Sequence, residues 1–344
     1  MLRYFLWAYI VTAAGLVGAF ALGWSYSGTL HGAISFGLIG AVLAVLEISL
    51  SFDNAIVNAN KLEAMTPVWR HRFLTWGILI AVFGMRIIFP LLVVVIAAHI
   101  GPIEAIRLAA TDPARYAAII GSAHLSIAAF GGAFLMMVAL SYFIDDGKEV
   151  DWISWLERKL RRFGSVRGTE IALVLLMMLG FSSLLEIEDR GTFLYAASFG
   201  LITFLGVELL GHVLDRSDAA MTVAKGGLGA FLYLEVLDAS FSFDGVIGAF
   251  ALTQNLFLIA IGLGIGAMYV RSMTLMLVER GTLAEFRYLE HGAFWSIFVL
   301  SVIMFAQALF HIPEVITGLL GAGFIGLALL SSLRHNRLAG EDRT

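Results

Sequence analysis

Carboxylate and other oxygen-bearing side chains recur at matching spacings in two apolar stretches, LEISLSFDNAIVNA and LEVLDASFSFDGVIGA. In the first stretch these side chains are Glu47, Ser51, Asp53 and Asn54, and in the second they are Glu235, Asp238, Ser242 and Asp244. Hard divalent cations such as Mg²⁺, Ca²⁺ and Mn²⁺ take oxygen ligands of this kind. The two stretches therefore predict a divalent-metal site built from Glu47, Asp53, Asn54, Glu235, Asp238 and Asp244, with Ser51 and Ser242 as possible additional ligands.

A structural alternative is that these acids only pair with two arginines, Arg86 and Arg271, that also fall within apolar stretches. A carboxylate at the centre of a bilayer costs at least about 2.5–3.5 kcal/mol, so it normally faces a partner or a pathway. Pairing with two arginines would leave two or three of the acids without a countercharge. A bound divalent cation, or protonation, would remove the excess negative charge.

The composition is that of a polytopic membrane protein. Of the 344 residues, 60% are hydrophobic and 14% charged, and the mean hydropathy is +0.89. A spanning helix needs roughly 20 apolar residues, which predicts an all-α chain with about ten transmembrane helices. These lie near 5–24, 32–58, 72–98, 117–143, 170–187, 192–213, 227–252, 257–278, 292–310 and 313–333. The absence of cysteine excludes disulfides and thiolate metal sites.

Basic residues predict the orientation, because Lys and Arg are enriched in cytoplasmic loops. With ten spans and Arg3 inside, only three of the 22 Lys and Arg residues fall in outer segments, namely Arg107, Arg115 and Arg190. Both termini are then cytoplasmic, and we expect a bacterial-type inner membrane.

The lipid bilayer and a metal ion are the expected partners, and no nucleic acid is expected; the oligomeric state stays open.

The order of chemical groups repeats along the chain. Each acidic helix is followed by a helix with an arginine and then by one with a histidine near its start, His124 in the first copy and His291 in the second. In the predicted topology the two copies run in opposite directions. Inverted repeats of this kind are typical of secondary transporters, which bind substrate near the bilayer midplane. A structural and a ligating role for the histidines are about equally supported.

These features predict six segments. They are an N-terminal transmembrane helix (1–31), a first three-helix repeat (32–143), a cytoplasmic linker (144–168), two linking helices (169–225), a second repeat (226–310), and a last helix with a cytoplasmic tail (311–344). In the linker, Trp152, Trp155 and Leu156 share one helical stripe opposite a charged face. An interfacial amphipathic helix and a solvated linker explain this pattern equally well.

Local geometry limits how the acids can meet. Glu47 and Asp53 are six residues apart, so on a straight helix they point in different directions. They would converge better if the helix opened at Ser51-Phe52-Asp53. In the second stretch, Glu235 and Asp238 are three residues apart and share one face.

The paired motifs, with SFDNA (Ser51 to Ala55) as the most specific piece, resemble those of the TerC-like integral membrane proteins, in the wider lysine-exporter superfamily. The resemblance covers about residues 32–310 and is strongest to a branch described only as a domain of unknown function. It implies divalent metal export, chiefly of manganese, with Glu47, Asp53, Asn54, Asp238 and Asp244 as ligands. The chain departs from the pattern at Gly245, where the first copy has Asn54.

The leading hypothesis is a divalent metal-ion exporter that works by alternating access around the intramembrane carboxylates. Mn²⁺ is the expected substrate, with Ca²⁺ or Mg²⁺ as alternatives, and no permanently bound cofactor is expected. An exporter of amino acids or other small solutes, and an accessory subunit that loads metal into exported proteins, remain alternatives. The sequence carries no H-E-x-x-H or G-x-S-x-G motif, and we expect that the chain is not an enzyme.

Overall fold

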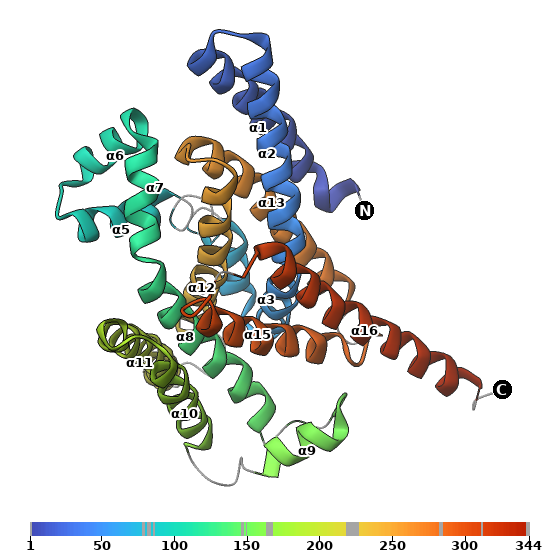
Figure 1. Cartoon of the computed structure of the whole chain (residues 1–344). Helices are drawn as coiled ribbons and strands as arrows, with labels where there is room; N and C mark the ends of the chain where they lie inside the picture. Colours follow the sequence, from blue (N-terminus) through green and yellow to red (C-terminus); the bar gives the residue numbers. More distant parts are fainter. Residues whose placement is uncertain are drawn as a thin grey trace. The chain divides into compact units, whose positions relative to one another are not determined.

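The computed structural model describes residues 2–77, 80, 84, 87–145, 148, 150–162, 168–217, 227–281, 285–310 and 312–341, and these residues form helices joined by short connections (Figure 1). The all-α prediction is confirmed. The chain divides into two compact units. Unit 1 comprises residues 1–51, 66–124 and 234–276, and unit 2 comprises 52–65, 125–233 and 277–344.

Unit 1 begins with a helical hairpin of α1 (Leu2–Ser27) and α2 (Leu30–Leu50), which lie side by side in Figure 1. The turn between them needs Gly28 at φ +63°, and Thr29 caps α2 by accepting a hydrogen bond from the Gly32 N–H. A Cβ at Gly23 would lie 2.7 Å from the carbonyl oxygen of Gly32. Glycine therefore permits the close approach of the two helices.

The rest of unit 1 consists of further helices. They are α4 (Pro67–Arg72), the π-helix η1 (Phe73–Gly77), α5 (Phe89–Ala98), α6 (Pro102–Thr111) and α7 (Pro113–Ser122), followed by the later part of α12 (Leu228–Leu252) and most of α13 (Leu256–Arg280). Proline at the start of α6 and of α7 suits the first helical turn, where no N–H partner is needed. One apolar cluster joins α2, α12 and α13 through Leu43, Val246 and Ile259.

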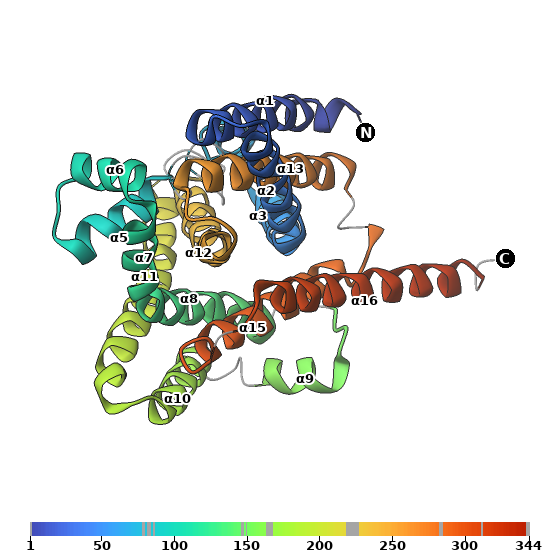
Figure 2. The same cartoon turned by 45° about the horizontal axis from the view of Figure 1, so that its top comes forward.

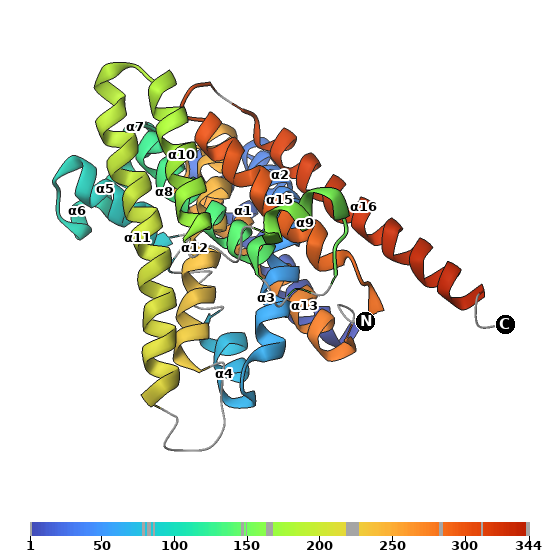
Figure 3. The same cartoon turned by 90° about the horizontal axis from the view of Figure 1, so that it is seen from below.

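Unit 2 contains α3 (Phe52–Ala64), α8 (His124–Ile144), α9 (Ser154–Arg162), α10 (Thr169–Leu184), α11 (Ile187–Ser217), α15 (Leu289–Ala306) and α16 (Glu314–Glu341). Helices α15 and α16 lie side by side in Figure 2, and α10 and α11 form a hairpin in Figure 3. Both α15 and α16 also contact α3. Glycine permits α8 and α16 to approach α15 closely, because a Cβ at Gly132 would meet the ring of Phe305 and one at Gly292 would meet Ala328.

Seven described helices are long and apolar enough to cross a membrane, as expected for a polytopic membrane protein. They cover Arg3–Ser27, Leu30–Ser49, His124–Ile144, Ile187–Leu210, Leu256–Arg280, Leu289–Ala306 and Ile316–Leu338. The other three predicted spans are not among these seven helices, each for a local reason. The stretch 72–98 contains η1 and residues outside the described part, α10 has only 16 residues, and α12 carries three acids within its 25 residues. The count of ten and the inverted repeat stay predictions.

Candidate functional site

The first acidic motif lies at a break between two helices. Helix α2 ends at Leu50, Ser51 adopts φ −104° and ψ 17°, and α3 begins at Phe52. The hydroxyl of Ser51 donates to Glu47 Oε1 at 3.2 Å, so the serine stabilises the last turn of α2. The α-helix is thus interrupted at Ser51, within the segment whose opening would help Glu47 and Asp53 to converge. The second motif differs, because the backbone of α12 is helical from Leu228 to Leu252 without interruption.

Glu47 is buried in unit 1, with 2% of its surface exposed. Two glycines make room for it. A Cβ at Gly245 of α12 would lie 2.8 Å from Glu47 Oε2, and a Cβ at Gly266 of α13 would overlap the Cβ and Cγ of Glu47. Gly245 occupies the place where the first motif has Asn54. The close approach of the Glu47 carboxylate explains why the second motif carries glycine there.

Glu235 is the second notable acid of unit 1. Both of its carboxylate oxygens are buried and have no hydrogen-bond partner among the described residues, and a Cβ at Gly77 of η1 would lie 2.6 Å from Oε1. Asp238 follows one turn later on the same helix. The predicted ligand Asp244, with Ser242, lies on the helical backbone of α12, and their side chains fall outside the described part.

The predicted arginine partners are placed differently. Arg271 lies on α13 and donates from Nε and Nη2 to the carbonyl oxygen of Leu74 at 3.0 and 2.8 Å. Leu74 belongs to η1, so this arginine joins two helices of unit 1 through a backbone carbonyl; no described carboxylate forms an ion pair with it. Arg86 lies outside the described residues.

In unit 2, Asp53 is 4% exposed and sits in the first turn of α3. Its Oδ1 accepts from the Asn54 N–H at 2.8 Å, and its Oδ2 accepts from the hydroxyl of Ser296 on α15 at 2.8 Å. The Oδ1 of Asn54 is buried and has no hydrogen-bond partner among the described residues. The position of Asp53 at a helix N-terminus also favours its negative charge.

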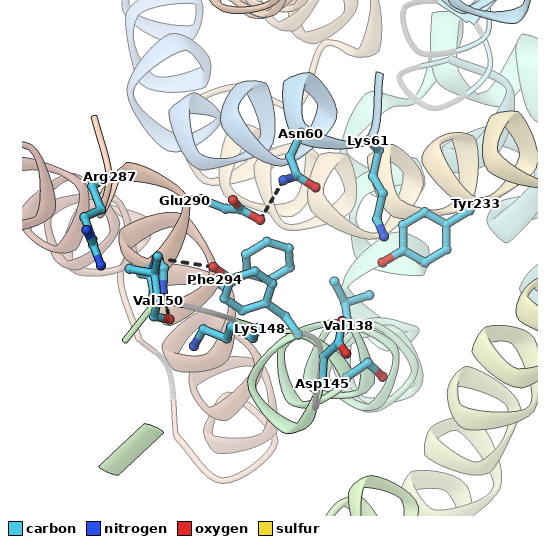
Figure 4. Close-up of a pocket in the computed structure, with 13 residues that line it drawn as sticks. Asn60, Lys61, Val138, Asp145, Lys148, Val150, Tyr233, Arg287, Glu290 and Phe294 are labelled. Atoms are coloured by element: carbon cyan, nitrogen blue, oxygen red, sulfur yellow. Dashed lines mark hydrogen bonds between the residues drawn. The ribbon is translucent and has the colours of Figure 1, made fainter. Parts of the chain in front are cut away.

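A second polar contact joins the same two helices further along. Asn60 Nδ2 of α3 donates to Glu290 Oε1 of α15 at 2.6 Å. Beside it lies a cavity of about 400 Å³ (Figure 4), with Lys61, Asp145, Lys148, Tyr233, Arg287 and His291 among its lining residues. Ser296, Asn60, Lys61 and Glu290 are not among the site residues that the sequence predicts. The only sequence signal was that Asn60 follows Asp53 by about two helical turns and Glu290 precedes His291.

His291 is buried at the start of α15, and both of its ring nitrogens contact oxygen atoms. Its Nε2 lies 2.8 Å from the carbonyl oxygen of Val150, and its Nδ1 lies 3.3 Å from the hydroxyl of Tyr142. His124 is half-buried at the first residue of α8. The contact between His291 and Val150 joins α15 to the linker.

The linker is held in place by a buried acid, Glu157 of α9, which is 0% exposed. Lys148 Nζ donates to its Oε2 at 2.6 Å, and the N–H groups of Trp152, Ile153 and the Trp295 indole also donate to it. Burial by itself would raise the pKa of Glu157, but the bonds from Lys148, Trp295 and Ile153 outweigh it and lower the pKa. Glu157 is thus buried against α15, whereas Trp155, on the opposite side of α9, is exposed.

Metal-binding side chains do not converge within the described part of the chain. No three His, Asp or Glu side chains that are described there lie close enough to hold a metal ion. Unit 1 carries Glu47, Glu235 and Asp238, and unit 2 carries Asp53 and Asn54.

Comparison with known proteins identifies the family. A family model described as "Protein of unknown function (DUF475)" matches residues 52–339. The chain belongs to the DUF475 family. No curated protein and no solved structure matches the chain.

The DUF475 match includes most of the candidate site. Asp53 and Asn54 fall at its start, and Asp238, Asp244 and Glu290 fall within it, whereas Glu47 lies before its first residue. The match also covers the linker and the α15–α16 hairpin. The polar contacts between α3 and α15 thus lie wholly inside the region that matches the DUF475 family model.

Proposed function

We propose that this protein exports hard divalent cations, above all Mn²⁺, by alternating access around its intramembrane carboxylates. The observation that carries the proposal is the burial of one carboxylate and one amide whose oxygens lack hydrogen-bond partners among the described residues. Both carboxylate oxygens of Glu235 and the Oδ1 of Asn54 are buried without a hydrogen bond among the described residues. Such atoms are costly in an apolar surrounding, and a bound cation would satisfy them.

The ligand types support a hard cation. Carboxylate, amide and hydroxyl oxygens suit Mn²⁺, Mg²⁺ and Ca²⁺ better than softer metals, and the chain has no cysteine. The resemblance of the two motifs to TerC-like proteins favours Mn²⁺ among these ions. It also favours export, which in the predicted topology carries the ion away from the cytoplasmic termini through a bacterial-type inner membrane.

The distribution of the acids supports a transport cycle. Glu47, Glu235 and Asp238 belong to unit 1, and Asp53 and Asn54 belong to unit 2. In alternating access, two parts of a transporter exchange the side to which the binding groups are open. A break in the helix at Ser51, where the chain passes from one unit to the other, supplies a backbone position that can absorb such a change.

The test is Asp53→Asn, which keeps the size of the side chain and removes its charge. We expect purified full-length protein in liposomes to move Mn²⁺, and the variant to lose that flux by at least about tenfold, since a lost charge interaction of 1.4 kcal/mol is worth that factor. Asp189→Asn, at an exposed residue of α11, is the matched control and should transport like the wild type.

Two outcomes would overturn the proposal. One is Mn²⁺ flux through Asp53→Asn equal to that of the wild type. The other is a folded wild-type protein that moves no divalent cation in liposomes while cells lacking it mismetallate exported proteins, which would favour the accessory-subunit alternative.

A further inference from the structure

Helices α3 and α15 run antiparallel and are joined by a polar contact near each end of their interface. Asp53 Oδ2 accepts from Ser296 at 2.8 Å, and Asn60 donates to Glu290 at 2.6 Å. Seven residues of α3 separate the two contacts, which corresponds to about 10 Å at 1.5 Å per residue. The interface therefore holds one carboxylate at a deep position, Asp53, and a second one, Glu290, about two turns away.

The Glu290 end of the interface opens into the cavity of about 400 Å³. Figure 4 shows Asn60 bonded to Glu290 on one side and Lys61 beside Tyr233 on the other. In the predicted topology the segments that line this cavity, around residues 60, 145, 148 and 287, are all cytoplasmic. A cation that approached Asp53 from the cytoplasm along α3 would pass this cavity first.

Lys61 is one of the charged residues that line the cavity, and within the described residues it forms no ion pair. Its Nζ lies over the ring of Tyr233, 5.1 Å from the ring centroid. The neighbouring Lys148 does have an ion-pair partner, because Glu157 accepts its hydrogen bond at 2.6 Å. A cation–π contact holds an ammonium group more weakly than an ion pair does in a buried site, so Lys61 can be displaced.

A stripe of polar side chains leads from the cavity toward Asp53. Asn54, Asn58 and Lys61 recur at i, i+4 and i+7 on α3 and thus share one face. Asn54 is 7% exposed, and its Oδ1 has no hydrogen-bond partner among the described residues. Amide oxygens on such a stripe offer successive neutral ligands to a hard cation.

We propose that this cavity is the cytoplasmic loading site of the transporter. Glu290 is the carboxylate that first binds the incoming divalent cation, and Lys61 is a tethered cation that occupies the cavity until the metal ion displaces it. The metal ion and the ammonium group repel each other, so they cannot both remain in the cavity at low cost. This inference rests on the proposed function and adds to it the position of the first binding step.

The test is the concentration dependence of Mn²⁺ transport by the full chain in liposomes. Glu290→Gln should raise the KM for Mn²⁺ by about tenfold with the maximal rate largely kept, because a charge interaction worth 1.4 kcal/mol gives that factor. Lys61→Met keeps the apolar stem, removes the competing charge, and should lower the KM. Matched controls are Glu285→Gln and Lys159→Met, which change exposed residues and should leave the KM unaltered.

The outcomes separate this inference from the proposed function. If the wild type transports Mn²⁺ but Glu290→Gln leaves the KM unchanged, or if both Glu290→Gln and Lys61→Met raise it, the loading site is overturned while the transporter stands. If the wild type transports nothing, the proposed function itself fails. If Glu290→Gln does not fold, two other variants still test the loading site. Glu290→Asp keeps the charge and must keep transport, and Lys61→Met must lower the KM.

Discussion

Gly245 and Gly266 define the room available to the buried side chain of Glu47, and they do so in different ways. A Cβ at Gly245 would meet only the carboxylate oxygen at 2.8 Å, which is the far end of a flexible side chain. A Cβ at Gly266 would overlap the first two side-chain carbons of Glu47, which cannot move without the helix. The first glycine therefore controls where the carboxylate points, and the second controls helix packing.

This difference predicts opposite effects of alanine at the two positions. Gly245→Ala should leave thermal stability almost unchanged and reduce Mn²⁺ flux, because only the Glu47 carboxylate moves. Gly266→Ala should destabilise the protein by about 1–3 kcal/mol, the usual cost of overpacking. Unfolding midpoints in detergent and flux in liposomes measure the two effects. A Gly245→Ala variant with full flux would show that the position of the Glu47 carboxylate does not matter.

At the scale of elements, the linker helix α9 is fixed to α15 by hydrogen bonds to one acid. Glu157 accepts from Lys148 at 2.6 Å and from the indole of Trp295 at 2.9 Å. The side chains of Lys148 and Glu157 are 7% and 0% exposed, whereas those of Arg161 and Asp151 in the neighbouring pair are 27% and 12% exposed. Buried and partly exposed ion pairs thus occur in one short segment.

The buried pair should dominate the attachment of the linker. Glu157→Gln leaves the ammonium of Lys148 buried without a countercharge and should destabilise the attachment by roughly 3 kcal/mol. Arg161→Gln, at the more exposed pair, should cost about 1 kcal/mol or less. Limited proteolysis between residues 145 and 168 measures the attachment. Equal cleavage of the two variants would contradict the assigned role of Glu157.

The pH dependence of this cleavage follows from the lowered pKa of Glu157. A carboxyl group whose pKa is lower in the folded state stabilises that state above its ordinary pKa of 4.5 and loses this contribution as the pH falls through the lower value. The wild-type linker should therefore stay attached near neutral pH and become cleavable only below about pH 4.5. The Glu157→Gln variant should show no such acid transition.

At the scale of the whole molecule, the orientation in the membrane can be tested directly, because the chain has no cysteine. Single substitutions Ser154→Cys, Leu338→Cys and Glu188→Cys place thiols at exposed residues of α9, α16 and α11. Positive charges in the loops predict that only Glu188→Cys is outside. An impermeant maleimide should label that variant in intact cells and the other two only after permeabilisation. Labelling of Ser154→Cys in intact cells would refute the predicted topology.

The sequence alone was sufficient for the membrane class, the helical fold and the recognition of the acidic motifs. These features depend on local rules, since a spanning helix must be apolar along its own length and a charge within it stands out against that background. The acidic motifs are likewise recognised locally, since Glu47, Ser51 and Asp53 lie within seven residues of the chain.

The partners of the motif residues were decided only by tertiary structure. Ser296 lies 243 residues from Asp53, Glu290 lies 230 from Asn60, and Trp295 lies 138 from Glu157. Whether such side chains meet depends on which helix faces pack together and in which register, and apolar helices that are hydrophobic on most sides carry little information about either. For the same reason, Gly245 stood out in the sequence only as a missing ligand, and the packing of α2 against α12 showed that it makes room for Glu47.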